Sequence, residues 1–455
     1  MLTAAWVEFD LALDLFPLAA ALLAVVTCGL LGNYLVLRRQ SLMGDAISHA
    51  VLPGLVIAFL LSTSRSGTLM LVGATAAGVF TVVAIELVKR LGRVEPGAAM
   101  GVVFSLMFAL GVLLIEQAAV RHVDLDADCV LYGQLETLAW FGAPPTWGEL
   151  WAWSTVEAVP RSVWLLLVMC GVSFAFVGLL YKELRVASFD PELATSQGVH
   201  AGAVHYALMV LVAAATVASF EAVGSILVIA MLIAPAATAR LLTDRLGVQL
   251  CLSLAAAAVA GLVGYFGATA VPVALHEANV LPGLFTGGSV NAAGGMTVAA
   301  GGLVVLAAVG SPSHGVVARA WRRRRLGREA AVDDLLAALY RRRERGESLT
   351  TPADLADGVV YQPARALRFA RRRGLVEVVS PREALGLTGA GLRRAAEVMR
   401  RHRLWEDYLV ADAGLRADHV HDTAERFEHL PLSPKRDAAV DPHGRPIPPP
   451  HDPAG

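Results

Sequence analysis

The sequence is poor in charge and, above all, in lysine. Charged residues make up 17% of its 455 residues, against about 25% in soluble globular domains. The only lysines are Lys89, Lys182 and Lys435, and none of them follows a GxxxxG segment. The chain therefore lacks the phosphate-binding loop that holds ATP in many ATPases. We expect any ATP that drives this protein to be bound by a separate partner chain.

Cysteine is scarce as well. The four cysteines lie far apart and form no CxxC pair, and three of them fall within apolar runs, where cysteine acts as a small hydrophobic residue. The pattern therefore indicates neither a disulfide framework nor a zinc-finger site built on Cys28, Cys129, Cys170 and Cys251.

Apolar residues are abundant by contrast, at 56% of the chain with a mean hydropathy of +0.57. A spanning helix needs about 20 mostly apolar residues. Residues 1–14 hold no lysine or arginine, unlike the start of a signal peptide. The sequence predicts an all-α polytopic membrane protein, with transmembrane helices near 15–37, 46–64, 68–88, 98–117, 162–181, 201–219, 222–241, 248–270 and 296–312.

The loops between these runs differ in positive charge. One set carries only Arg65, Arg121 and Arg161. The positive-inside rule therefore places the opposite set in the cytoplasm, together with the C-terminus. The cytoplasmic set carries Arg38, Arg39, Lys89, Arg90, Arg93, Lys182, Arg185, Arg240 and Arg245.

A polar tail follows the last run. Residues 1–317 hold 12 Lys and Arg against 19 Asp and Glu, whereas residues 318–455 hold 26 against 20, a net charge of +6. We divide the chain into a transmembrane domain (1–317), a basic linker (318–329), a soluble domain (330–434) and a disordered Pro-rich end (435–455). The soluble domain reads as a cytosolic winged helix plus further helices. Its helices are expected over 331–343, 351–358, 362–373, 387–409 and 419–429, with a β-wing strand over 374–381.

Two ionisable residues stand out in the second apolar run. Asp45 and His49, in RRQSLMGDAISHAVLPG, are four positions apart and hence on one helix face. Ionisable groups at membrane depth are costly and point to an ion or proton path. A carboxylate beside an imidazole suits manganese, zinc or ferrous iron. Spacing alone leaves open a helix-end cap with a hydrogen-bonded buried histidine. Pro53-Gly54 is expected to break this helix.

The same segment closely resembles the signature of the metal-importing ABC permease family, which serves manganese, zinc and iron. The resemblance covers roughly residues 12–320. It implies a permease subunit of an ATP-binding cassette importer, which is not itself an enzyme. Further segments match that family's coupling segment, late transmembrane signature and end-of-domain motif, in the expected order: ASFDPELATSQGV (187–199), VGSILVIAMLIAPAATAR (223–240) and SPSHG (311–315).

This resemblance assigns Asp45 and His49 to the metal translocation path. It assigns Phe189, Asp190, Glu192 and Gly198 to the segment that docks on the ATPase, where Asp190 can cap a short helix begun by Pro191. It also implies an extracellular or periplasmic metal-binding protein, a permease homodimer or paired permease, and lipid contacts in the bacterial cytoplasmic membrane. Manganese is the expected substrate, with zinc and iron as alternatives.

Histidines and acids recur at helical spacing in the tail. His402 and Glu406 are four positions apart, and His421 precedes a run of Glu425, Glu428 and His429 on one helix face. Such pairs can ligate a transition metal, but spacing alone favours an ordinary charged amphipathic helix.

From Met399, MRRHRLWEDYLVADAGLRADHVHDTAERFEHLPLSP resembles the metal-binding and dimerisation domain of the iron- and manganese-dependent, diphtheria-toxin-type repressors. The resemblance covers about 330–434, including the winged helix. It implies one metal site of Asp334, Glu425, Glu428 and His429, and another of His402, Glu406 and His421. Asp334 and Glu425 match the manganese-responsive branch. Ala337 replaces a second acid of that branch, which puts a binuclear site in doubt.

Three functions remain to be separated. The preferred one is a metal importer whose cytosolic tail senses metal and regulates transport. The alternative is a membrane-tethered, metal-responsive transcriptional regulator, although one span would suffice to anchor it. A proton-driven transporter would need no coupling segment. We expect no specific DNA binding by the tail, because anionic lipid also explains its arginines, Arg365, Arg368, Arg371, Arg372 and Arg373.

Overall fold

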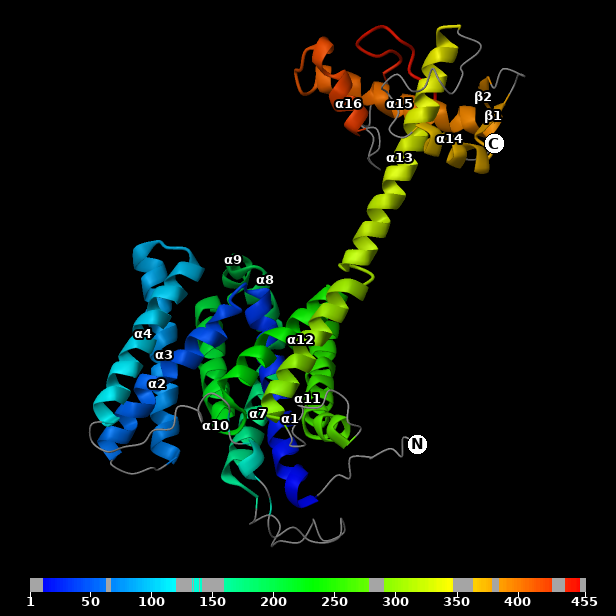
Figure 1. Ribbon diagram of the computed structural model, residues 1–455. Coiled ribbons are helices and arrows are strands. Elements are labelled where there is room, and N and C mark those ends of the chain that lie inside the picture. Colours follow the sequence, from blue (N-terminus) through cyan, green and yellow to red (C-terminus); the bar gives the residue numbers. More distant parts are fainter. Residues whose placement is uncertain are drawn as a thin grey trace. The chain divides into compact units, whose positions relative to one another are not determined.

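The computed structural model describes residues 11–62, 67–119, 133, 135–138, 140, 159–277, 290–346, 363–378, 384–427 and 438–450. These parts are mostly helical (Figure 1). The chain divides into two compact units, Met1–Ala318 and Arg319–Gly455, beside the boundary that the change in polarity predicts.

Unit 1 is a bundle of apolar helices. Nine segments of the described residues are long and apolar enough to cross a membrane, which confirms the predicted all-α polytopic fold of this unit and agrees with the nine apolar runs of the sequence. The elements are α1 (Leu11–Leu37), α2 (Leu42–Ser62), α3 (Gly67–Gly92), α4 (Pro96–Ala119), η1 (Leu135–Leu138), α7 (Arg161–Leu179), α8 (Tyr181–Phe189), α9 (Pro191–Ser196), α10 (Ala201–Leu242), α11 (Leu246–Glu277) and α12 (Ala292–Gly310).

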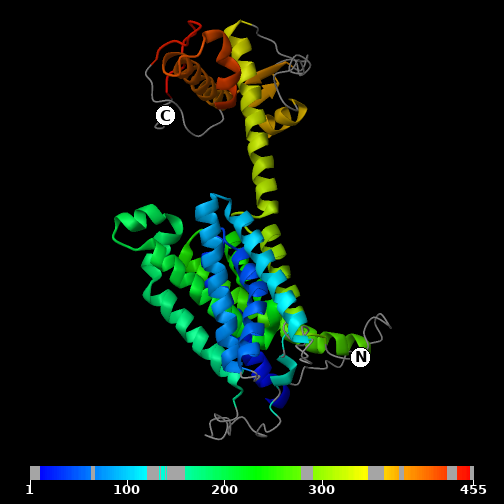
Figure 2. The ribbon, with the colours of Figure 1, turned by 90° about the vertical axis from the view of Figure 1, so that its left-hand side faces the viewer.

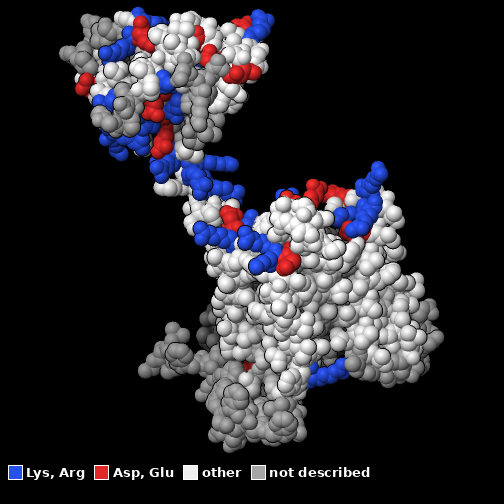
Figure 3. Space-filling model, turned by 180° about the vertical axis from the view of Figure 1, so that it is seen from behind, with Lys and Arg blue, Asp and Glu red and all other residues white. Residues whose placement is uncertain are grey.

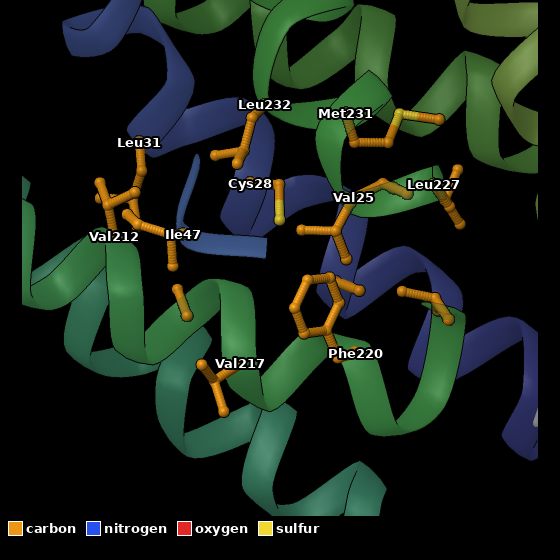
Figure 4. Packing of buried hydrophobic residues seen from close by; sticks show 14 of the residues in the cluster. Val25, Cys28, Leu31, Ile47, Val212, Val217, Phe220, Leu227, Met231 and Leu232 are labelled. Carbon is orange, nitrogen blue, oxygen red and sulfur yellow. The ribbon is translucent and has the colours of Figure 1, made fainter. Parts of the chain in front are cut away.

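Helix α1 lies inside this bundle and packs against α7, α10 and α11, while α2 packs against α3 and α4 (Figures 1 and 2). Side chains of α1, α2 and α10 fill the centre of the bundle (Figure 4). At Gly32 an added β-carbon would overlap the carbonyl of Leu232, so α1 and α10 touch backbone to backbone. Such close approach through small residues is typical of helix packing in membranes.

Two predicted spans merge in α10. The expected segments 201–219 and 222–241 both lie in this element, and Gly224, near the start of the second segment, has a non-helical backbone with φ 75° and ψ 166°. A positive φ costs glycine nothing, since it has no β-carbon. Gly224 therefore lets two spans follow each other with almost no connecting loop.

The predicted break at Pro53-Gly54 does not occur. Helix α2 continues through Pro53 to Ser62. Proline is tolerated inside membrane helices because neighbouring groups can satisfy the backbone carbonyl that it leaves without a partner. Gly54 serves packing instead, because an added β-carbon there would collide with the backbone carbonyl of Gly73 in α3.

Unit 2 contains α13 (Val316–Glu344), which begins just before the unit boundary, α14 (Pro363–Arg372), β1 (Val376–Val378), β2 (Leu385–Leu387), α15 (Gly389–Ala411), η4 (Ala417–His419) and α16 (His421–Phe427). The segment 318–329, expected as a linker, is helical within α13. Strands β1 and β2 pair antiparallel, with Val376 opposite Leu387. The expected helix over 351–358 lies outside the described residues.

Residues 438–450, here called the C-terminal strap, pack on α15. The carbonyl of Pro448 accepts a 2.7 Å hydrogen bond from Arg400, and that of Pro446 accepts one from Arg403. Ile447 is buried. Composition alone predicts disorder here, because proline-rich segments bury little apolar surface. The strap is ordered instead, because the backbone carbonyl groups of Pro446 and Pro448 accept hydrogen bonds from arginines of α15.

Candidate functional site

Asp45 and His49 lie one turn apart on α2. The Nε2 atom of His49 is 3.4 Å from Oδ1 of Asp45, and the side chains are 31% and 38% exposed respectively. The ring of His49 packs beside two aromatic rings of α4, with centroids 5.2 Å from Phe104 and 5.6 Å from Phe108. The aromatic rings limit where the imidazole can point. The pair thus offers a nitrogen and a carboxylate oxygen to a cation that reaches α2.

The segment that follows α8 has the local structure expected from its sequence. Asp190 caps α9 by accepting hydrogen bonds from the backbone N–H groups of Glu192 and Leu193, at 3.1 and 2.9 Å. Pro191 is the first residue of α9, and Gly198 has φ 83°. Phe189 and Leu193 are 57% and 47% exposed. The end of α8 and the capped helix α9 therefore present two apolar side chains, Phe189 and Leu193, on the surface of unit 1.

Arg38 joins this segment to the start of α2. Its Nε donates to Oγ of Ser188 at 3.1 Å, and its Nη1 donates to Nδ1 of His205 at 2.9 Å. Arg38 thus ties the loop before Asp45 to α8 and α10. Sequence reasoning missed this role. The residue stands in the quoted RRQSLMGDAISHAVLPG segment, but its partners are more than 100 positions away.

The tail contains a compact cluster of potential metal ligands. His402, Glu406 and His421 each offer one ligand atom, and these atoms all lie within 4.8 Å of one another. Oε1 of Glu406 is 3.1 Å from Nε2 of His402 and 2.8 Å from Nδ1 of His421. The side chains of His402 and Glu406 are buried, while that of His421 is partly exposed. Helices α15 and α16 bring these residues together.

Glu406 is held as a carboxylate. Burial raises its pKa, but hydrogen bonds with His402 and His421 and the charge of Arg445 outweigh burial and keep the pKa well below its usual range. Two imidazole nitrogens and a carboxylate oxygen are donors that suit zinc, iron and manganese. The cluster therefore fits a divalent transition metal in donor type and spacing.

Two of the four other predicted tail ligands lie within the described residues. Asp334 lies on α13 and Glu425 on α16, and no group of three potential ligands that includes either is found in the described part of the chain. Glu428 and His429 lie outside the described residues. The neighbouring Asp333 binds Arg394, at 2.7 Å.

Arginines surround a cavity of about 600 Å³ between α13 and α14. Figure 3 shows Lys and Arg side chains on one face of unit 2. Within the described residues, Arg323 and Arg324 have no carboxylate within ion-pair distance, while Arg328 stacks over the ring of Phe369. The cavity is lined by Arg323, Arg324, Arg328, Arg365 and Phe369, among others. Such a surface suits phosphate groups.

Family comparisons divide the chain in a similar way. The model of the ABC 3 transport family matches residues 15–140 and 154–277. The model described as "Iron dependent repressor, metal binding and dimerisation domain" matches residues 388–435, which include His402, Glu406 and His421.

Individual proteins are similar over much of the chain. The manganese transport system membrane protein MntD of Bacillus subtilis is 39% identical over 261 residues, covering 57% of this chain and 85% of that protein. The zinc transport system membrane protein TroD of Treponema pallidum is 38% identical over 363 residues, covering 78% and 91%. The solved structure of PsaBC from Streptococcus pneumoniae in complex with Fab matches with a TM-score of 0.50 and 27% identity, over 66% of this chain and 92% of that one.

Proposed function

The chain belongs to the ABC 3 transport family, and we propose that it is the membrane-spanning permease subunit of an ATP-driven importer of divalent transition metal ions. Both resemblances seen in the sequence are confirmed, the repressor-like one over residues 388–435. The observation that carries the proposal is an ionisable pair, Asp45 and His49, within a spanning helix of a family member. Metal uptake by cells that carry the chain and its partners tests this function.

In this proposal, Asp45 and His49 contact the metal on its way through the membrane. Manganese is the first candidate and zinc the second, since similar proteins are described as manganese and zinc transport proteins; iron is the third. A nitrogen and an oxygen donor accept all three ions. The two side chains leave most of the metal's coordination positions open to water or other groups, which lets the ion leave again.

The partners follow from the same family. An ATPase subunit docks on Phe189, Asp190, Glu192 and Gly198, and hydrolyses the ATP that this chain cannot bind. A second permease, identical or paired, completes the pathway, and an extracellular or periplasmic protein delivers the ion. The chain crosses the bacterial cytoplasmic membrane with its tail in the cytoplasm. There, the arginines around the α13–α14 cavity contact anionic lipid phosphates.

The tail acts as a metal sensor for the permease. His402, Glu406 and His421 bind metal when its cytoplasmic concentration is high, and the occupied tail lowers transport. Asp334, Glu425, Glu428 and His429 are assigned to a second metal site. The alternative, a membrane-tethered transcriptional regulator, is favoured only by the repressor-like match and the arginine-lined cavity.

Removing the tail cluster should abolish this feedback. In metal-replete cells, the double variant His402→Ala, His421→Ala is expected to take up manganese faster than wild type, because losing two ligands should weaken metal binding at the cluster by about 10-fold or more, the loss that removing a ligand's hydrogen-bond partner alone produces. The initial rate of radioactive manganese uptake, at equal membrane abundance, measures the effect.

A matched control is His419→Ala, which removes an exposed histidine outside the cluster and should leave feedback intact. A chain truncated after residue 320 should behave like the double variant. Equal uptake by wild type, the double variant and the truncated chain in metal-replete cells would rule out a sensing tail.

A further inference from the structure

The C-terminal strap places the charged side chain of Arg445 beside the tail's metal cluster. Nη2 of Arg445 lies 3.3 Å from Oε2 of Glu406. The other carboxylate oxygen, Oε1, faces His402 and His421. The two oxygens of Glu406 thus have different partners: one points into the cluster, and the other is bound by a guanidinium from a segment of the chain 39 positions away.

Arg445 is fixed in place by Asp441. Oδ2 of Asp441 accepts a 2.8 Å hydrogen bond from Nε of Arg445, and Oδ1 accepts bonds from the backbone N–H groups of His443 and Arg445. The turn also contains Gly444 at φ 76°. Asp441 is buried, with 4% of its surface exposed. The guanidinium therefore reaches Glu406 from a pre-formed turn, which favours a specific contact over a chance surface pair.

Contacts with α13 and α15 hold the turn that contains Asp441 and Arg445 on the core of unit 2. Arg403, which is 1% exposed, donates to the carbonyl of Pro446 and pairs with Glu344 of α13 through both of its terminal nitrogens. Its Nε lies 3.9 Å from Oδ2 of Asp441. A chain of charged groups thus runs from α13 through α15 to the strap and ends on Glu406.

We propose that Arg445 sets the metal selectivity of the tail cluster by occupying Oε2 of Glu406, so that this carboxylate binds metal through Oε1 alone. The proposal rests on the proposed function of the cluster as a metal site. It assigns Arg445 as a positioning residue, because it acts through Glu406.

The consequence for selectivity follows from donor number. With Oε2 held by Arg445, the cluster offers two imidazole nitrogens and one oxygen, a set found in zinc sites that keep one position open. Manganese belongs with the ions that favour oxygen ligands and six-fold coordination. A carboxylate that binds through both oxygens gives such an ion one more oxygen donor. Arg445 should therefore favour zinc relative to manganese, in contrast to the preference expected for the second tail site.

Metal binding to the full-length protein in detergent tests this selectivity. All variants carry Asp45→Asn, His49→Gln, Glu425→Gln and His429→Gln, so that metal bound at the permease pair or at the second proposed tail site does not contribute. Manganese and zinc affinities are measured by competition with a chelating dye. The variant Arg445→Met keeps an unbranched apolar stem but removes the guanidinium with its charge and donors. It should bind manganese about 10-fold more tightly than the Arg445 protein, with a change of less than about 3-fold for zinc, the scale that partners of metal ligands produce.

Two further variants show whether a change in affinity comes from the contact of Arg445 with Glu406, from unfolding of unit 2, or from the loss of any positive charge. Asp441→Asn leaves Arg445 present but weakens its anchor, and should shift the manganese-to-zinc ratio in the same direction by a smaller factor. Arg416→Met removes a cation paired with Asp418 outside the cluster, and should change neither affinity. Melting temperatures of all variants show whether unit 2 stays folded.

The possible failures are distinguishable. If Glu406→Gln binds both metals as tightly as the Glu406 protein does, the cluster is not a metal site and the sensing function fails. If Glu406→Gln loses binding but Arg445→Met leaves the manganese-to-zinc ratio unchanged, only the role of Arg445 is overturned. A uniform gain for both metals would show a general charge effect and would also overturn the selectivity role.

Discussion

Replacing Asp45 by Asn together with His49 by Gln is expected to lower manganese uptake about 100-fold or more. The two side chains are the nitrogen and oxygen donors that α2 offers to a passing cation. Losing a group that is hydrogen-bonded to a metal ligand commonly lowers metal affinity by about 10–100-fold. Losing the carboxylate and the imidazole, which contact the metal themselves, should lower it further. Asn keeps the shape of the Asp45 side chain, whereas Gln replaces the imidazole ring of His49, which packs against Phe104 and Phe108, by a linear amide.

The measurement is the initial rate of radioactive manganese uptake in cells that also carry the ATPase and the metal-binding protein. Asp244→Asn is the matched control, because Asp244 is an exposed acid paired with Arg240 beyond the end of α10. It should transport normally. Undiminished uptake by the double variant at normal membrane abundance would remove Asp45 and His49 from the metal path.

Replacing Phe189 by Asp should uncouple the permease from its ATPase. Phe189 is 57% exposed beside the capped helix α9, and central aromatic residues of an interface commonly contribute about 2 kcal/mol or more to binding. A charge in its place should reduce association of the ATPase by about 30-fold or more, the factor that 2 kcal/mol represents. Uptake should fall with it.

Co-purification of the ATPase with the permease measures this loss directly. Phe189→Leu keeps an apolar side chain and should retain most of the binding. If Phe189→Asp purifies with a full complement of ATPase and transports normally, the segment around α9 is not the docking surface.

The spans were predictable because each needs only a continuous apolar run, a property of neighbouring residues. The cap of α9 was predictable for the same reason, since Asp190 and Pro191 act on residues two or three positions away. The kink at Gly224 and the continuous path of α2 through Pro53 were not. The packing of each helix against others in the bundle decides them.

In the candidate sites, too, the sequence predicts contacts between nearby positions but not contacts between distant ones. His402 and Glu406 are one helical turn apart, so their pattern was visible, and the repressor resemblance added His421. The contacts of Arg38 with Ser188 and of Arg445 with Glu406 join distant positions. For Arg445 the sequence does contain a signal: Asp441 and Gly444 in DPHGR are typical of a tight turn. Its proline-rich surroundings obscured that signal.

The most direct test of metal import is whether uptake depends on ATP hydrolysis by a partner. Cells that lack other manganese importers would carry this chain with the metal-binding protein and either the active ATPase or an ATPase without its phosphate-binding lysine. We predict manganese uptake with the active ATPase and only background uptake with the inactive one. Equal uptake with both would show a transporter driven by another force, and no uptake of manganese, zinc or iron by the complete assembly would contradict metal import.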